Sequence, residues 1–176
     1  MKKLLALLIL LALSFSLASC GEDEYGHDAH LHPHYELGLY YSLPDDFEQR
    51  NLSYGDLVYT NGDAYFIINY YDETTLTEDM LLHPDITPKE FAETFTLFYS
   101  TNFDKEIPYN YDPETDTATY SYVHEYDDGT ESEYYTYMVF RNPQLVYQIT
   151  LSCYEKDIEK YETLFERILD SVSMAG

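Results

Sequence analysis

The chain has 176 residues, with 9 Lys plus Arg against 33 Asp plus Glu, which gives a formal net charge of −24. This excess of acids excludes a nucleic-acid-binding protein, because phosphate contact needs clustered Lys and Arg. Hydrophobic residues make up 45% of the chain, which has 21 Tyr and no Trp. That share is too high for a wholly disordered acidic protein, so we expect a folded domain.

The N-terminus has the three parts of an export signal. Lys2 and Lys3 form a basic start, Leu4–Leu13 is an apolar run, and Leu17-Ala18-Ser19-Cys20 is a mostly small-residue end. The apolar run is too short for a transmembrane helix, which needs about 20 apolar residues. Residues 1–19 are therefore predicted to be a signal peptide that is removed.

The stretch Leu17-Ala18-Ser19-Cys20 also resembles the bacterial lipoprotein box. The resemblance implies that the Cys20 thiol is diacylated, that cleavage occurs before it, and that the new amine receives a fatty acid such as palmitate. Two acyl chains suffice for durable anchoring, so we expect a protein held by lipid at the extracytoplasmic face of the cell membrane. The alternative is an ordinary signal peptide with a chance cysteine.

Residues 20–34 are predicted to be a tether and residues 35–176 a single domain. The segment 21–34 is rich in Gly, acids and His and shows neither helical nor strand periodicity. The residues that follow are numerous enough to bury a core without covalent staples. Cys153 has no intramolecular partner once Cys20 is acylated, so no disulfide is expected.

Four segments show the period-two alternation of half-buried antiparallel strands: Ala64–Tyr71, Thr117–Tyr126, Ser132–Phe140 and Leu145–Cys153. In the last of these, Gln148, Thr150 and Ser152 lie opposite the apolar side. Asn61-Gly62 precedes the first segment and Asp128-Gly129 separates the second from the third, and both dipeptides favour hairpin turns. The last three segments are therefore predicted to form a meander.

Two helices are predicted beside this sheet. Thr87-Pro88-Lys89-Glu90 fits a capping box with Pro at the first helical position, and Phe91, Phe95 and Phe98 follow at helical spacing. A broad apolar stripe marks a second helix over Ile158–Val172. We interpret Asp72–Ile86 as a loop, with a short helix over Glu78–Leu82 as the alternative. The fold class is thus α+β, an antiparallel sheet flanked by helices.

This order of elements resembles the family built on the PsbP-like fold. The resemblance rests on Tyr41-Ser42-Leu43-Pro44-Asp45-Asp46-Phe47 and on the closing stretch from Tyr147-Gln148-Ile149 to the helix that ends Ile168-Leu169-Asp170-Ser171-Val172, and it covers about residues 35–174. It implies an antiparallel sheet flanked by helices. Family members include extracytoplasmic lipoproteins and serve in partner binding and assembly without a shared catalytic set, so no functional residue carries over.

Histidines are the densest group of candidate metal ligands. His27, His30, His32 and His34 lie close together, and neutral imidazoles bind zinc or copper. A metal-binding lipoprotein is therefore the alternative function, with zinc as its metal. Under the plainer interpretation, these histidines only keep a polar tether soluble, and the protein has no cofactor.

Tyrosines form the candidate binding surface: Tyr120, Tyr122, Tyr126, Tyr134, Tyr135 and Tyr137. A face lined by Tyr can stack on a sugar or hold a peptide, because each ring offers a large contact area and loses little entropy. The plainer interpretation is that Tyr simply fits a half-buried pleated surface.

Catalysis has weak support in the sequence. Cys153 with His83 or His124 imitates a nucleophile pair, but Cys153 falls on the apolar side of its strand, where a thiol is normally inert. Acidic loops suit calcium, yet the EF-hand order is absent, and so are the common phosphate, hydrolase and metalloprotease motifs. We predict a non-enzymatic, lipid-anchored binding or assembly module with a protein or cell-wall glycan partner.

Overall fold

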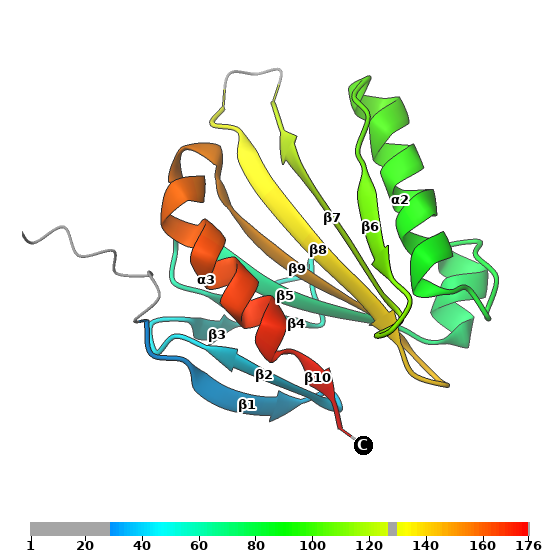
Figure 1. The fold of residues 1–176 in the computed structure, drawn as a ribbon, viewed down its shortest axis with the longest axis horizontal. Helices are drawn as coiled ribbons and strands as arrows, with labels where there is room; N and C mark the ends of the chain where they lie inside the picture. Colours follow the sequence, from blue (N-terminus) through cyan, green and yellow to red (C-terminus); the bar gives the residue numbers. More distant parts are fainter. Residues whose placement is uncertain (1–28, 127–129, 176) are drawn as a thin grey trace, which may run out of the picture.

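The computed structural model describes residues 29–126 and 130–175, and its centre is a seven-stranded antiparallel sheet (Figure 1). The strand order is β3-β4-β5-β9-β8-β7-β6. The strands are β3 (Glu48–Arg50), β4 (Leu57–Thr60), β5 (Ala64–Tyr71), β6 (Tyr109–Asp112), β7 (Thr117–His124), β8 (Glu133–Arg141) and β9 (Val146–Tyr154).

The predicted meander is confirmed, and a long-range pairing completes the sheet. Strands β7, β8 and β9 are consecutive neighbours, and β5 pairs with the free side of β9 from Ala64↔Cys153 to Tyr71↔Val146. The Asn61-Gly62 turn is also confirmed. Gly62 has φ +100°, and the Asn61 side chain accepts hydrogen bonds from the backbone N–H groups of Asp63 and Ala64. Asp128-Gly129 lies outside the described residues.

A smaller antiparallel sheet, of order β1-β2-β10, packs near the C-terminus of the chain. Its strands are β1 (His32–Glu36), β2 (Leu39–Leu43) and β10 (Ser173–Met174). Strand β1 corrects the boundary expected from the sequence, because it begins inside the segment assigned to the tether. The hydropathy pattern gave no sign of it: β1 is an edge strand whose side chains are exposed or half-buried, and it is held by backbone pairing with β2.

Both predicted helices are present. Helix α2 (Pro88–Phe103) begins at Thr87, whose side chain accepts a hydrogen bond from the backbone of Glu90, while the Glu90 carboxylate accepts one from the backbone of Thr87. Helix α3 (Ile158–Ser171) follows the short 3-10 turn η2 (Glu155–Asp157). The segment expected as a loop contains a short π-helix, η1 (Thr75–Asp79). It begins three residues before the short helix that we gave as the alternative, Glu78–Leu82. No helix in the described part of the chain combines the length and apolarity needed to cross a membrane.

The large sheet carries a hydrophobic core on each face. On one face, α3 and β2 cover apolar residues of β5 and β9, including Phe66, Ile149 and Leu151, which are all fully buried. On the other face, α2 and η1 cover residues of β7 and β8 such as Ala118 and Val139. Strand β9 is therefore buried on both sides. This corrects the expectation of a half-buried strand there, because Gln148, Thr150 and Ser152 on its polar side are also nearly buried, at the floor between the taller side chains of β5 and β8.

Helix α2 presents its aromatic residues unevenly. Phe91 is fully buried and Phe95 is half-buried, as the helical spacing predicts, but Phe98 is 61% exposed. Phe91 belongs to the buried cluster that also contains Leu76 of η1 and Ile86. Phe98 lies about two turns further along, and there Tyr99 takes the inward position, with its ring against that of Tyr122.

Candidate ligand-binding groove

The sequence-predicted sites at the N-terminus are only partly within the described structure. Cys20 and His27 lie outside the described residues. His32 contacts Asp45 (Nε2 to Oδ1, 3.0 Å), and its ring stacks on that of His30 with centroids 5.0 Å apart. His34 stacks on Tyr41 instead, at 5.3 Å. No three His, Cys, Asp or Glu side chains within residues 29–126 and 130–175 are grouped to hold a metal ion, so zinc or copper binding stays a prediction.

The six predicted tyrosines do not form one surface. Tyr120 pairs with Tyr137 and Tyr122 with Tyr135 across β7 and β8, so these four share a face. Tyr134 projects to the opposite face and packs against the core under α3. Tyr126 follows the end of β7, and its hydroxyl donates a hydrogen bond to Glu133 (2.8 Å).

Much of this tyrosine set is interior. Tyr120 and Tyr137 stack with ring centroids 4.6 Å apart and are 3% and 7% exposed. Tyr99 of α2 covers them from above, with its ring 4.9 Å from that of Tyr122. Burial raises the pKa of Tyr120, Tyr122 and Tyr137 well above the usual value. These rings therefore belong to the core beneath α2, and whether the tyrosines also bind a ligand stays a prediction.

Beside this stack, the same face of the sheet is open and forms a groove of about 480 Å³, a size typical of small-molecule sites. We call it the tyrosine groove. Its lining consists of Tyr54, Tyr65, Ile67, Asn69, Tyr99, Glu133, Tyr135, Tyr137, Gln148, Thr150 and Ser152.

Strand pairing explains the shape of the tyrosine groove. Ser152 of β9 lies between Tyr65 of β5 and Tyr135 of β8, and Thr150 lies between β5 and Tyr137 in the same way. Since side chains two apart on a strand share a face, the short polar residues of β9 make a low floor. The longer tyrosines on the neighbouring strands make the walls.

The floor is polar and only partly satisfied by the protein. Gln148 donates to the Tyr120 hydroxyl (2.8 Å) and accepts from the Tyr71 hydroxyl (2.9 Å), which fixes its amide. The hydroxyls of Thr150 and Ser152 make no hydrogen bond to any described residue, although these residues are only 5% and 6% exposed. Neither hydroxyl oxygen is fully buried, so both face the groove and are available to a ligand or to water.

A glycine positions the outer wall. Gly55 packs so closely on the sheet that a Cβ there would overlap Cγ2 of Ile67 and lie 2.9 Å from Cγ2 of Val58. This close approach lets the loop before β4 fold over the sheet. Tyr54 then meets the ring of Tyr65 edge to face, with centroids 6.2 Å apart.

Glu133 is the single carboxylate in the lining of the tyrosine groove. It shares a face with Tyr135, two residues along β8, and its Oε2 accepts hydrogen bonds from the hydroxyls of both Tyr126 and Tyr135. Burial is the main cause that raises the pKa of Tyr135 well above its usual value, and the hydrogen bond to Glu133 raises it further, so the phenol stays protonated. Glu133 thus lies at one end of the groove, held by two tyrosines.

The groove contains no nucleophile paired with a base. Cys153 lies on the other face of β9, is 3% exposed, and has its pKa raised by burial to about 12, so it is a packing residue. Neither His83 nor His124 lines the groove. The arrangement of rings, hydroxyls and one carboxylate is suited to binding.

A second hollow, of about 500 Å³, lies on the opposite face between β7 and the end of α3. Its lining includes Thr117, Thr119, Met138, Leu169 and Met174. It has no stacked aromatic walls and no buried polar floor comparable to Thr150 and Ser152. We therefore take the tyrosine groove as the better candidate site.

The fold has counterparts among solved structures. The chain aligns with cyanobacterial PsbP (CyanoP) from Synechocystis sp. PCC 6803 at a TM-score of 0.54 and 15% identity, covering 90% of this chain and 99% of that one. The chain has a PsbP-like fold. The Ran-binding protein Mog1p of Saccharomyces cerevisiae aligns at a TM-score of 0.53 and 11% identity, covering 83% of this chain and 97% of that one. The sequence matches no protein-family model and no curated protein.

At such identities the likeness establishes the PsbP-like fold and no site residue. The groove residues that the sequence analysis missed include Tyr54, Tyr65, Glu133, Thr150 and Ser152. One signal was available for the floor: three polar residues alternate with the apolar ones of β9. We expected them to face solvent, because the sequence does not reveal that β9 is the central strand.

Proposed function

We propose that the chain is a non-enzymatic extracytoplasmic binding module whose ligand occupies the tyrosine groove. The observation that carries this proposal is the pair of unbonded hydroxyls, Thr150 and Ser152, on a nearly buried floor between tyrosine walls. Both hydroxyl oxygens reach the groove, so a ligand that enters it can hydrogen-bond to them in place of water.

A photocrosslinking residue placed in the groove wall tests this proposal. Tyr54 in the groove and Tyr40 in β2 are both 51% exposed, so Tyr40 is a matched control position. A benzophenone amino acid at position 54 should capture a discrete adduct in intact cells, and the same residue at position 40 should not. Ser152→Phe, which fills the space between Tyr65 and Tyr135, should abolish the adduct. Equal capture at both positions, or capture that persists in Ser152→Phe, contradicts the proposal.

We also propose that the protein is anchored through acyl chains on Cys20. The resemblance of Leu17-Ala18-Ser19-Cys20 to the lipoprotein box supports this proposal. Labelling with a radioactive fatty acid should mark the wild type and not Cys20→Ser, which should leave the membrane fraction. Equal labelling of both proteins contradicts the anchor.

Zinc binding is the second candidate function. It is supported by the contact between His32 and Asp45 and by the adjacent ring of His30. Calorimetric titration with zinc should give heat with the wild type that is lost in a His30→Ala/His32→Ala double variant. His83→Ala, a substitution at an exposed histidine elsewhere, is the control. Equal heats from all three proteins end this candidate.

A further inference from the structure

The lining of the tyrosine groove carries negative charge and no positive charge. Glu133 is half-buried, and no Lys, Arg or His lines the groove with it. Its Oε2 is occupied by two tyrosine hydroxyls, whereas its Oε1 accepts no hydrogen bond and forms no ion pair within the described residues. A partly buried carboxylate with an open oxygen is complementary to a cation.

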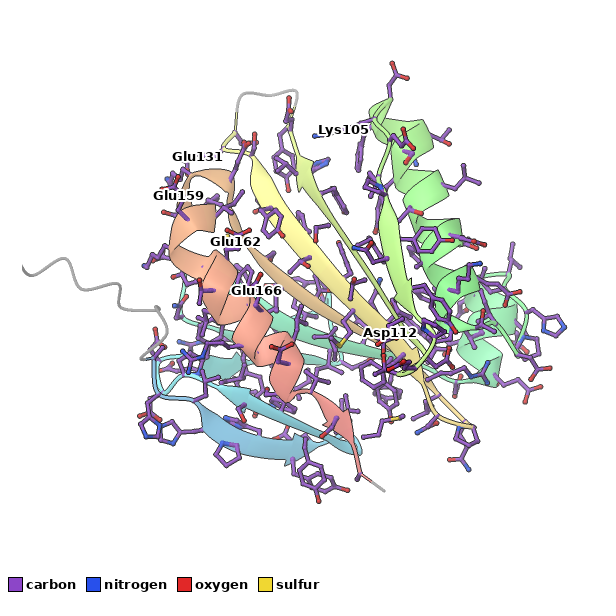
Figure 2. All side chains as sticks on the ribbon, viewed as in Figure 1. Lys105, Asp112, Glu131, Glu159, Glu162 and Glu166 are labelled. Carbon is purple, nitrogen blue, oxygen red and sulfur yellow. The ribbon has the colours of Figure 1, made fainter. Side chains whose placement is uncertain are left out.

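The charge of the chain beyond the groove is also negative. Glu131, two residues before Glu133, pairs with Lys156 at 2.6 Å. Glu159 and Glu162, labelled on α3 in Figure 2, lie with that helix on the opposite face of the sheet and act only through the long-range field. With a net charge of −24 for the chain, the long-range field repels anionic ligands and attracts cations.

Tyrosines stand on both sides of Ser152 in the groove. Tyr65 and Tyr135 occupy next-but-one strands, so their Cα atoms are about 9.6 Å apart, with only the small Ser152 between them. A group above Ser152 is about 5 Å across the sheet from the strand that bears each tyrosine, a spacing compatible with the roughly 6 Å range of a cation–π interaction. Tyr54, edge to face with Tyr65, adds a third ring.

We propose that the tyrosine groove binds an organic ammonium group, held between Tyr65, Tyr135 and Tyr54 and neutralised by Glu133. The proposal rests on the groove being the ligand site, as proposed above. A methylated ammonium suits the site best, because its charge is spread over apolar methyl groups that pack on rings and need no hydrogen-bond acceptors. The floor hydroxyls then bind polar atoms of the rest of the ligand. Such an ammonium group belongs either to a free solute or to a lipid headgroup.

Choline and its neutral carbon isostere, dimethylbutanol, separate the charge from the shape of the ligand. Titration of the wild-type mature chain, followed by calorimetry or by NMR, should show choline binding at least about 10-fold more tightly than the isostere. Glu133→Gln should weaken choline binding by about 10-fold and leave the isostere unchanged. Tyr54→Leu should weaken choline binding about 3- to 10-fold, whereas Tyr40→Leu, at a matched exposure, should not.

The variants also guard against misfolding. Tyr54 is 51% exposed, so its substitution leaves the core intact, and far-UV circular dichroism checks each variant. Equal affinity of choline and dimethylbutanol, or undiminished choline binding by Glu133→Gln, overturns the proposal. If choline fails to bind while Ser152→Phe still abolishes crosslinking from position 54, the groove is the site and the ammonium assignment is wrong. If both fail, the proposed function fails too.

The source of the ammonium is distinguished in a parallel measurement on the Cys20→Ser protein. Binding to phosphatidylcholine vesicles that exceeds binding to phosphatidylethanolamine vesicles, and that free choline competes away, assigns the group to a lipid headgroup. Binding of free choline without retention on either vesicle assigns it to a soluble ligand. Vesicle binding that is equal for Glu133→Gln and for the wild type counts against the groove.

Discussion

Buried tyrosines make the stability of this protein sensitive to alkali. Tyr41, Tyr120 and Tyr137 are 1%, 3% and 7% exposed, and burial raises the pKa of each well above the usual value of about 10. A tyrosine whose pKa is raised in the folded state gives its full stabilisation below pH 10. Above pH 10 the unfolded chain releases a proton that the folded chain retains, so stability falls as pH rises.

The magnitude follows from linkage. Each such tyrosine lowers the free energy of unfolding by about 1.4 kcal/mol at pH 11 and by about 2.7 kcal/mol at pH 12. The three tyrosines together then lower the free energy of unfolding by about 4 kcal/mol at pH 11 and by about 8 kcal/mol at pH 12. Because a typical domain is stable by about 5–15 kcal/mol, we expect cooperative unfolding between about pH 11 and pH 12.

Tyrosinate absorbance and far-UV circular dichroism, followed together along a pH titration, measure this transition. Exposed tyrosines should ionise gradually near pH 10 without loss of structure, and a second group should ionise in one step as the dichroism signal collapses. The urea-unfolded chain, with a single broad titration near pH 10, is the reference. If all tyrosines titrate near pH 10 while the dichroism signal persists to pH 12, the burial argument is refuted.

Three further outcomes test the packing described above. Gly55→Ala should lower the free energy of unfolding in urea by about 1–3 kcal/mol, because the added Cβ has no room against the β-branched side chains of Ile67 and Val58. The control Ser53→Ala, in the same loop, should change it by less than about 0.5 kcal/mol. Thr87→Ala removes the cap of α2 and should cost about 1 kcal/mol by the same measurement, and no loss would contradict the capping box. In the Cys20→Ser protein, the buried thiol of Cys153 should react with a thiol reagent only at the rate of unfolding, and rapid reaction of the folded protein would contradict its burial.

The helices and strands of this fold could be predicted from the sequence, but the way in which distant strands pair could not. Alternation located the strands that end at Tyr71 and begin near Val146, and the capping box at Thr87 located α2 to the residue, because both signals depend on near neighbours. The pairing of β5 with β9 joins residues about 80 positions apart, and no local pattern specifies it. The face of Tyr134 followed from strand alternation, but which face α2 covers did not.

The position of the groove follows from the mismatch between one helix and a wide sheet. Seven strands about 4.8 Å apart span about 29 Å, whereas a helix with its side chains is only about 10–12 Å across. On the first face, α3 and the small sheet share the task of covering the strands. On the second face, α2 packs mainly over β6, β7 and β8 and reaches β5 at Tyr71, whose ring stacks on Phe91, so much of β5 and β9 is left beside it.

A strip of sheet that no helix covers is ordinarily either an apolar surface that binds other proteins or a polar surface exposed to water. This strip is neither, because Thr150 and Ser152 form a polar floor and tyrosine side chains on both sides restrict the access of solvent to it. If the strip were only a solvated face, replacing the floor hydroxyls by isosteric apolar groups would leave binding unaffected. Thr150→Val keeps the shape and removes one hydroxyl, so it should be neutral or stabilising for the fold and should weaken retention of the ligand. Improved stability with unchanged crosslinking at position 54 would show that this hydroxyl is not used for binding.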